Sequence, residues 1–156
     1  MTATALPTVP DTARLTAASA LQKLLPELVA LTLDAKQAHW NVTGPGFLPL
    51  HSLTDQIAAD TRIWTDRVAE RAVALGLTVD ARPATVASSV SEPFPAGRLS
   101  DHETIFELAG RIGDIAATAR DSLVVLEQSD AVAHGVTVDV LEGLEKYRWM
   151  LQAHAR

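Results

Sequence analysis

The chain has 156 residues, of which 47% are hydrophobic and 21% are charged, the profile of one soluble globular domain. It contains no cysteine, so disulfides, thiol catalysis and thiolate metal sites are excluded, and a cytoplasmic location is expected. The 19 acidic residues outnumber the 13 basic ones, and the resulting formal charge of −6 disfavours binding to the phosphate backbone of nucleic acids.

Residues 1–13 are expected to form a flexible N-terminal tail ahead of a single domain at residues 14–156. The tail is rich in Thr, Ala and Pro, and it has neither the basic residues nor the apolar run of a signal peptide. No stretch of the chain approaches the roughly 18 apolar residues of a membrane span, so we expect no membrane association.

The first half of the domain predicts two long helices joined by a turn. Leucines recur at three- and four-residue steps from about Thr16 to Trp40, as one buried helix face requires. Pro26 predicts either a kink in this helix or a helix start near that point. Residues 41–46 (Asn-Val-Thr-Gly-Pro-Gly) are typical of a turn. The second helix is expected from about Leu48 to Leu75, with Gly76 as its C-terminal cap.

The second half predicts a long connection followed by two more helices. Residues 77–99 are rich in Pro, Gly and small residues, which favours a crossover that encloses one short helix. Ser100 and Glu103 fit a capping box that opens a helix over about 101–128. A last helix is expected to begin between Asp130 and Thr137 and to reach about His154. Four long helices with one long crossover predict an all-α, ferritin-like four-helix bundle.

Four side chains that can bind metal share one stripe of the second helix. His51, Asp55, Asp66 and Glu70 are separated by 4, 11 and 4 residues, and they span about 100° of the helix circumference. Asp55 and Asp66 are nevertheless about 16 Å apart along the axis, whereas a metal ion needs its ligand atoms within about 2.0–2.6 Å. One chain therefore cannot bring both pairs to one ion.

The spacing is symmetric about residues 60–61, and this symmetry predicts how a complete site could form. An antiparallel copy of the helix, packed about a two-fold axis at that point, would set His51 and Asp55 opposite the partner subunit's Asp66 and Glu70. Two equivalent sites between subunits would result, and His39 could join each as a further nitrogen ligand from across the turn.

The alternative is that the stripe is simply a solvated helix face, which is the commoner origin of such a pattern. Against it, apolar residues including Leu53, Ile57 and Val68 border the stripe, so the helix cannot expose a wide polar side. Imidazole and carboxylate ligands without sulfur suit Fe(II), Mn(II) or Zn(II). A di-iron site inside one bundle would need Glu-x-x-His pairs, and the sequence contains none.

These residues and their surroundings closely resemble the Dps family, the mini-ferritins named for protecting DNA in starved cells. The resemblance covers roughly residues 15–155. It is carried by Lys-Gln-Ala-His-Trp-Asn-Val-Thr-Gly-Pro at 36–45, Phe47, Leu50-His51, Asp55, Asp-Arg-Val-Ala-Glu-Arg at 66–71, Leu75-Gly76, Leu-Glu-Lys at 144–146 and Trp-Met-Leu at 149–151.

The resemblance implies a hollow dodecamer with ferroxidase centres at its two-fold interfaces. Each centre would use His39, His51 and Asp55 of one subunit with Asp66 and Glu70 of its neighbour, both to bind iron and to catalyse its oxidation. Fe(II) would be oxidised by hydrogen peroxide in preference to dioxygen, and the ferric product would be stored as mineral in the cavity. Zinc or manganese could bind the same ligands. Removing both Fenton reactants would protect the cell against oxidative damage.

Further residues have weaker signals. Lys36, one turn from His39, could donate to a ligating carboxylate or could be solvated. Trp40 and Trp64 flank the ligands in sequence; the resemblance implies that an aromatic there can be oxidised, although core packing is the commoner role. Three acidic residues stand where the family places its three-fold iron-entry pores, although His-Gly at 134–135 replaces an acidic position of many relatives: Asp130, Asp139 and Glu142.

The rival hypotheses are a DNA-coating nucleoid protein without significant ferroxidase activity and a helical shell that binds structural zinc. Relatives that bind DNA directly often carry a Lys-rich tail, but the first basic residue here is Arg14. Twelve copies at −6 each would give a formal charge of −72. Direct DNA binding is therefore not expected.

Overall fold

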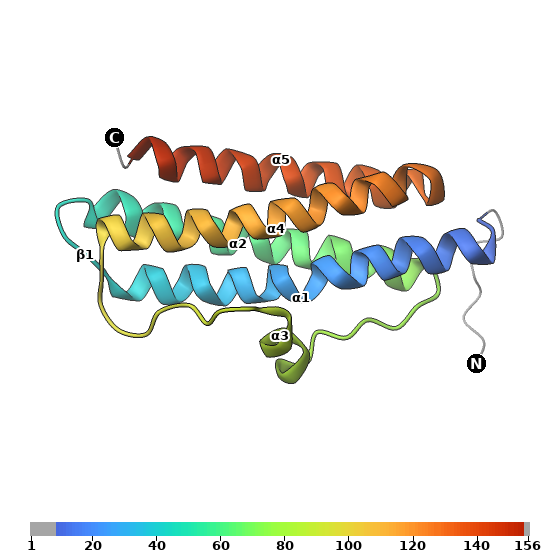
Figure 1. Cartoon of the computed structure of the whole chain (residues 1–156), viewed down its shortest axis with the longest axis horizontal. Helices are drawn as coiled ribbons and strands as arrows, with labels where there is room; N and C mark the ends of the chain where they lie inside the picture. The colour runs from blue at the N-terminus through green and yellow to red at the C-terminus, as the bar shows by residue number, and fades with distance from the viewer. Residues whose placement is uncertain (1–8, 155–156) are drawn as a thin grey trace.

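The computed structural model describes residues 9–154, and Figure 1 shows an essentially all-α arrangement. The four long helices are α1 (Asp11–Asn41), α2 (Phe47–Ala74), α4 (Asp101–Ser129) and α5 (Ala131–His154). A short helix, α3 (Pro83–Ser89), lies within the connection between α2 and α4. The predicted four-helix bundle with a long crossover is confirmed.

The crossover determines the direction of α4. It leaves the end of α2 and passes along α1, with α3 on its outer side, back to the end of the bundle where α2 begins (Figure 1). As a result, α2 and α4 run in the same direction, and α1 and α5 run in the opposite one. This is the connectivity of ferritin-like bundles, whereas up-down-up-down bundles have only short loops.

Two helix ends follow the local signals of the sequence. Gly76 has φ +89°, a left-handed conformation that glycine adopts without steric cost, and its N–H donates to the Val73 carbonyl at 2.9 Å. At the start of α4, the Ser100 side chain accepts from the backbone N–H of Glu103. The Glu103 carboxylate in turn accepts from the backbone N–H of Ser100 at 2.8 Å, so the predicted capping box is confirmed.

The start of α1 differs from the prediction. The helix begins at Asp11, so residues 11–13, which were assigned to a flexible tail, are helical; residues 1–8 lie outside the described part of the chain. The helix also continues through Pro26, so a helix start near that point is wrong. Pro26 is buried, and packing of the surrounding leucines offsets the backbone hydrogen bond that the ring removes.

A very short parallel sheet, which the sequence does not predict, fastens the α1–α2 turn to the end of the crossover. β1 (Val42–Thr43) pairs with β2 (Leu99–Ser100), and the Thr43 hydroxyl also donates to the Leu99 carbonyl at 3.0 Å. Strands of two residues have no side-chain periodicity that a sequence pattern can reveal.

The core runs the length of the bundle and is built mainly from leucine and alanine, and each leucine side chain gains roughly 1.5–3 kcal/mol on full burial. None of the helices within residues 9–154 carries an apolar segment long enough to cross a membrane. The largest fully buried side chains are Leu21, Leu24, Leu25, Leu28, Leu31, Leu50, Ile57, Leu75, Leu108, Ile112, Leu126 and Leu144.

Candidate metal centre

Two histidines face each other across the α1–α2 turn. His39 lies near the end of α1 and His51 near the start of α2, and their rings stack with centroids 3.7 Å apart. The Nδ1 atom of His39 is 2.7 Å from the His51 carbonyl oxygen, and the Nδ1 atom of His51 is 2.8 Å from the His39 carbonyl oxygen.

These two contacts determine which ring nitrogen can bind a metal. A carbonyl oxygen only accepts hydrogen bonds, so both Nδ1 atoms must carry the proton and donate. In the neutral imidazoles, both Nε2 atoms then keep a free lone pair. An Nδ1–H group held by a backbone carbonyl is the usual support of a metal-binding histidine, because it fixes the tautomer and the ring orientation.

Asp55 lies one turn after His51 and is engaged by Lys36. The Lys36 ammonium donates to Asp55 Oδ1 at 2.7 Å, and the side chains remain 31% and 60% exposed, respectively. This hydrogen bond, together with the positive charge of Lys36, holds the pKa of Asp55 below its ordinary value. Asp55 is therefore ionised at neutral pH and is paired with the Lys36 ammonium.

Asp66 and Glu70 lie further along α2, and both side chains are exposed. They share a helix stripe with His51 and Asp55 but not a location, since 11 residues separate the two pairs. Within residues 9–154, no group of three His, Asp or Glu side chains is close enough to hold a metal ion. The separation deduced from the sequence is thus present in the structure, and the two pairs do not meet within the described part of one chain.

The opposite side of α2 faces α5 and carries a different set of contacts. The Trp64 ring lies 6.1 Å from the Tyr147 ring, and the Tyr147 hydroxyl donates to Asp60 Oδ2 at 2.5 Å. Burial raises the pKa of Tyr147, and the Asp60 carboxylate acts in the same direction. Trp64 therefore packs inside the bundle, about 140° around α2 from His51 and about 180° from Asp55, while Trp40 is 68% exposed with Lys36 over its ring.

Two of the three residues predicted to line a pore are paired with arginines of α2. Arg71 donates to both carboxylate oxygens of Asp130, at 3.0 and 2.6 Å, and Asp130 also accepts from the Ala133 N–H at the start of α5. Burial opposes ionisation of Asp130, but these hydrogen bonds outweigh it and keep its pKa low. Asp139 is bound by Arg67 at 2.7 Å.

These contacts give Asp130 and Asp139 a structural role that the sequence did not predict. They fasten α5 to α2, and Asp130 also caps α5, which matches the usual preference for a carboxylate at a helix start. Glu142, by contrast, is exposed. A pore function for the three residues stays a prediction.

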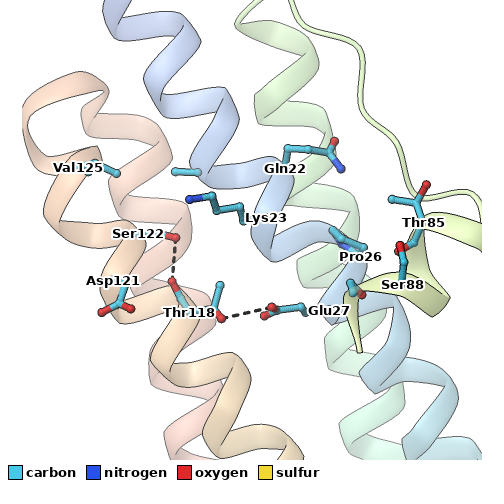
Figure 2. A pocket seen from close by; sticks show the side chains of 12 residues that line it. Gln22, Lys23, Pro26, Glu27, Thr85, Ser88, Thr118, Asp121, Ser122 and Val125 are labelled. Atoms are coloured by element: carbon cyan, nitrogen blue, oxygen red, sulfur yellow. Dashed lines mark hydrogen bonds between the residues drawn. The ribbon is translucent and has the colours of Figure 1, made fainter. Parts of the chain in front are cut away.

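A groove of about 520 Å³ lies between α1, α3 and α4, and none of the predicted metal ligands lines it (Figure 2). In its wall, the Thr118 hydroxyl donates to Glu27 Oε1 at 3.3 Å. The other oxygen of Glu27, Oε2, is buried without a hydrogen-bond donor among the described residues. Burial raises the pKa of Glu27, and the nearby charge of Asp114 raises it further. The groove is thus separate from the stripe of predicted metal ligands on α2.

Comparison with known proteins agrees with the fold. The ferritin-like domain family matches residues 18–156, so the chain is a ferritin-like protein. A DNA protection during starvation protein of Agrobacterium fabrum is 30% identical over 153 residues, covering 95% of this chain and 93% of that relative.

Two solved structures show the same relationship. Dps from Microbacterium arborescens in its high iron form has a TM-score of 0.91 at 33% identity, covering 96% of this chain and 98% of that one. Mycobacterium smegmatis Dps has a TM-score of 0.93 at 28% identity, covering 99% and 89%. The chain belongs to the Dps family.

Proposed function

We propose that the protein is a ferroxidase and iron store that assembles as a dodecamer. Each centre would combine His39, His51 and Asp55 of one subunit with Asp66 and Glu70 of its neighbour across a two-fold axis. Hydrogen peroxide would be the preferred oxidant, and the ferric product would be stored as mineral inside the shell. The iron is substrate and cargo, and the chain's residues bind it and hold it while it loses an electron.

The observation that carries this proposal is the pair of imidazoles with their Nδ1 atoms committed to backbone carbonyls. Histidines on a solvated helix face do not require a fixed tautomer. Metal-binding histidines do, because the Nδ1–H bond to a carbonyl leaves Nε2 free for the metal. The incomplete ligand set within one chain supports a site shared between copies, and the symmetric spacing along α2 supports a two-fold axis.

The ligand set also supports the direction of the chemistry. Carboxylates are hard ligands that stabilise Fe(III) relative to Fe(II), so they favour loss of an electron from the bound ion. Two ferrous ions supply the two electrons that reduce one hydrogen peroxide, and hydrolysis of the ferric product to an oxyhydroxide releases protons. With only two nitrogen ligands, the ferric ion is held loosely enough to leave for the cavity.

The deciding experiment mixes anaerobic Fe(II) with the purified protein, adds hydrogen peroxide and follows ferric absorbance, with the particle mass measured on the same sample. We expect oxidation much faster than in buffer, with the iron staying soluble in a particle of about 200 kDa, which corresponds to twelve chains of 16.6 kDa. Oxidation at the buffer rate with precipitation of iron would refute the proposal.

A double variant tests the location of the centre. Replacement of His51 and Asp55 by Ala should abolish fast oxidation and leave the particle mass unchanged, because neither side chain belongs to the core. The matched control replaces His102 and Asp121, an exposed His and an exposed Asp on α4, and should oxidise iron like the wild type. Unchanged oxidation in the His51 and Asp55 variant would place the centre elsewhere.

The second candidate function is physical coating of DNA, and the name of the Agrobacterium relative, a DNA protection protein, is the observation in its favour. Protection by consumption of iron and peroxide requires no contact with DNA. The two functions therefore differ in whether the protein retards DNA.

A further inference from the structure

Three helix ends meet beside the α1–α2 turn, and Asp101 lies at their centre. Asp101 is the first residue of α4, and its Oδ2 atom accepts from the Gly46 N–H at 2.9 Å while Oδ1 accepts from the His102 N–H at 2.9 Å. These backbone hydrogen bonds keep the pKa of Asp101 below its ordinary value. His154, at the end of α5, approaches the same point.

The β1–β2 pairing fixes the first residues of the turn, and the Phe47 N–H donates to the Gly44 carbonyl at 3.1 Å, but the residues that lead into α2 lie beyond the sheet. Gly46 is the N-cap of α2 and makes no side-chain cap, and Gly44 has φ +111°, a conformation that glycine adopts freely. The packing against Asp101 is nevertheless close, since a Cβ atom on Gly46 would lie 3.0 Å from Asp101 Oδ2. The carboxylate at the start of α4 therefore holds the second part of the turn, at Gly46, where the sheet does not reach.

This turn is the short covalent link between the two imidazoles. The residue after Gly46 is Phe47, whose ring lies 5.1 Å from the His51 ring. The reciprocal Nδ1 bonds of His39 and His51 each join one side of the turn to the other, at 2.7 and 2.8 Å. A small opening of the turn lengthens both bonds together, because both of them span the turn. Both then weaken, since hydrogen bonds weaken steeply with distance and angle.

We propose that Asp101 is a positioning residue for the histidine pair. By holding Gly46, it keeps the turn closed, and the closed turn keeps both imidazoles in the tautomer that leaves Nε2 free. Its functional meaning rests on the proposed metal centre, but its structural effect exists in the metal-free protein. Asp101 touches neither imidazole, so it acts only through the turn.

The test uses the full-length, metal-free wild type and Asp101→Asn, with NMR of the histidine ring nitrogens. Asn has one acceptor oxygen, so its NH₂ group would face one of the two backbone donors that Asp101 serves. We expect the wild type to show protonated Nδ1 for His39 and His51, and Asp101→Asn to show a mixture of tautomers. Binding of Co²⁺, a spectroscopic probe, should weaken about tenfold, the cost of a hydrogen bond to a charged group.

The matched control is Glu103→Gln, which disturbs the capping box of the same helix end but does not touch the turn. It should keep the wild-type tautomers and Co²⁺ affinity. If Asp101→Asn gives the wild-type tautomers, or if Glu103→Gln shifts them equally, Asp101 is not a positioning residue. Because the NMR readout uses no iron, this result is independent of whether the wild type oxidises Fe(II).

A second variant keeps the test decisive if Asp101→Asn does not fold. Gly46→Ala leaves Asp101 and its charge intact, and the backbone at Gly46 (φ −83°) accepts alanine. The added Cβ would crowd Asp101 Oδ2 and displace it from the Gly46 N–H. The same mixture of tautomers is expected, and wild-type tautomers in a folded Gly46→Ala protein would overturn the proposal.

Discussion

At the residue scale, Lys36 occupies Asp55, one of the proposed metal ligands. Its ammonium lies 2.7 Å from the carboxylate and is held in part by the Trp40 ring, 5.6 Å away. Lys36→Met keeps the aliphatic stem but removes the charge. We predict that divalent cations bind this variant a few-fold more tightly, because no resident cation has to be displaced. Titration of the assembled protein with Co²⁺ measures the change.

The control for this prediction is Lys23→Met, which removes an exposed charge from the same helix at a distance from the ligands. A general effect of net charge would tighten metal binding equally in both variants. Weaker binding by Lys36→Met would show instead that the lysine orients Asp55 for the metal.

A second prediction at this scale concerns Glu27, whose carboxylate lies in the groove of Figure 2. Burial raises its pKa in the folded chain above the unfolded value. Its favourable contribution to stability is therefore complete below the unfolded pKa and is lost as the pH rises through the folded pKa. At neutral pH the buried, ionised carboxylate lowers the free energy of unfolding, so Glu27→Gln should raise Tm by about 2 °C at pH 7.

The pH dependence of this difference distinguishes the cause. The gain should shrink towards zero near pH 4, where the carboxyl of the wild type is largely protonated. Glu127→Gln, at an exposed position of α4, should show no such trend. A gain that is constant with pH would mean that the amide stabilises the groove by new hydrogen bonds.

At the element scale, two kinds of contact join α2 to α5. Arg67 and Arg71 bind carboxylates at or near the start of α5, and the Trp64 ring packs against Gly143. A Cβ atom added at Gly143 would overlap the Trp64 ring. We predict that Gly143→Ala destabilises the fold by about 1–3 kcal/mol, the typical cost of overpacking a core. Gly110 has open space around it in the middle of α4. Gly110→Ala should therefore stabilise the helix slightly.

Urea unfolding followed by tryptophan fluorescence measures both changes, and an unaltered midpoint for Gly143→Ala would show that Trp64 has room to move. The contact agrees with core packing, the commoner of the two roles considered for Trp64, and a redox role stays a prediction. Two residues along a helix correspond to about 200° of rotation, so Trp64 and Asp66 must point to opposite sides of α2.

The helices could be predicted wherever their ends have local chemistry. Gly76 and the Ser100–Glu103 capping box gave ends accurate to about one residue, because these caps depend only on neighbouring residues. The start of α1 was placed five residues late, since Pro10 provides no side-chain cap. The pairing of Arg71 with Asp130 joins residues 59 apart in sequence, and it depends on the register of α5 against α2.

In the candidate metal centre, too, local features could be predicted and contacts between distant parts of the chain could not. The stripe on α2 and its symmetry follow from helix geometry alone, so His51, Asp55, Asp66 and Glu70 could be predicted. The reciprocal bonds of His39 and His51 could not, because they depend on how tightly the turn closes. The role of Asp101 was equally hidden, since the long crossover separates it from Gly46 by 55 residues.

At the scale of the whole molecule, the charge of the assembly determines whether it can coat DNA, the second candidate function. Each chain carries −6, so a dodecamer would carry a formal −72. The first basic residue is Arg14. Among the described residues, six arginines are already paired with carboxylates: Arg14, Arg67, Arg71, Arg82, Arg111 and Arg120. A shell of this charge repels the phosphate backbone over roughly 8 Å at physiological salt.

We therefore predict no mobility shift of plain duplex DNA by the assembled protein at neutral pH and physiological salt. The same preparation should protect that DNA from cleavage by Fe(II) and hydrogen peroxide, because it consumes both reactants before hydroxyl radicals form. The His51 and Asp55 double variant is the matched control, since it has lost the centre without gaining basic residues and should not protect. Retardation of DNA, or equal protection by that variant, would favour coating over chemistry. Loss of protection in the variant without retardation by either protein would assign the protective act to the metal centre.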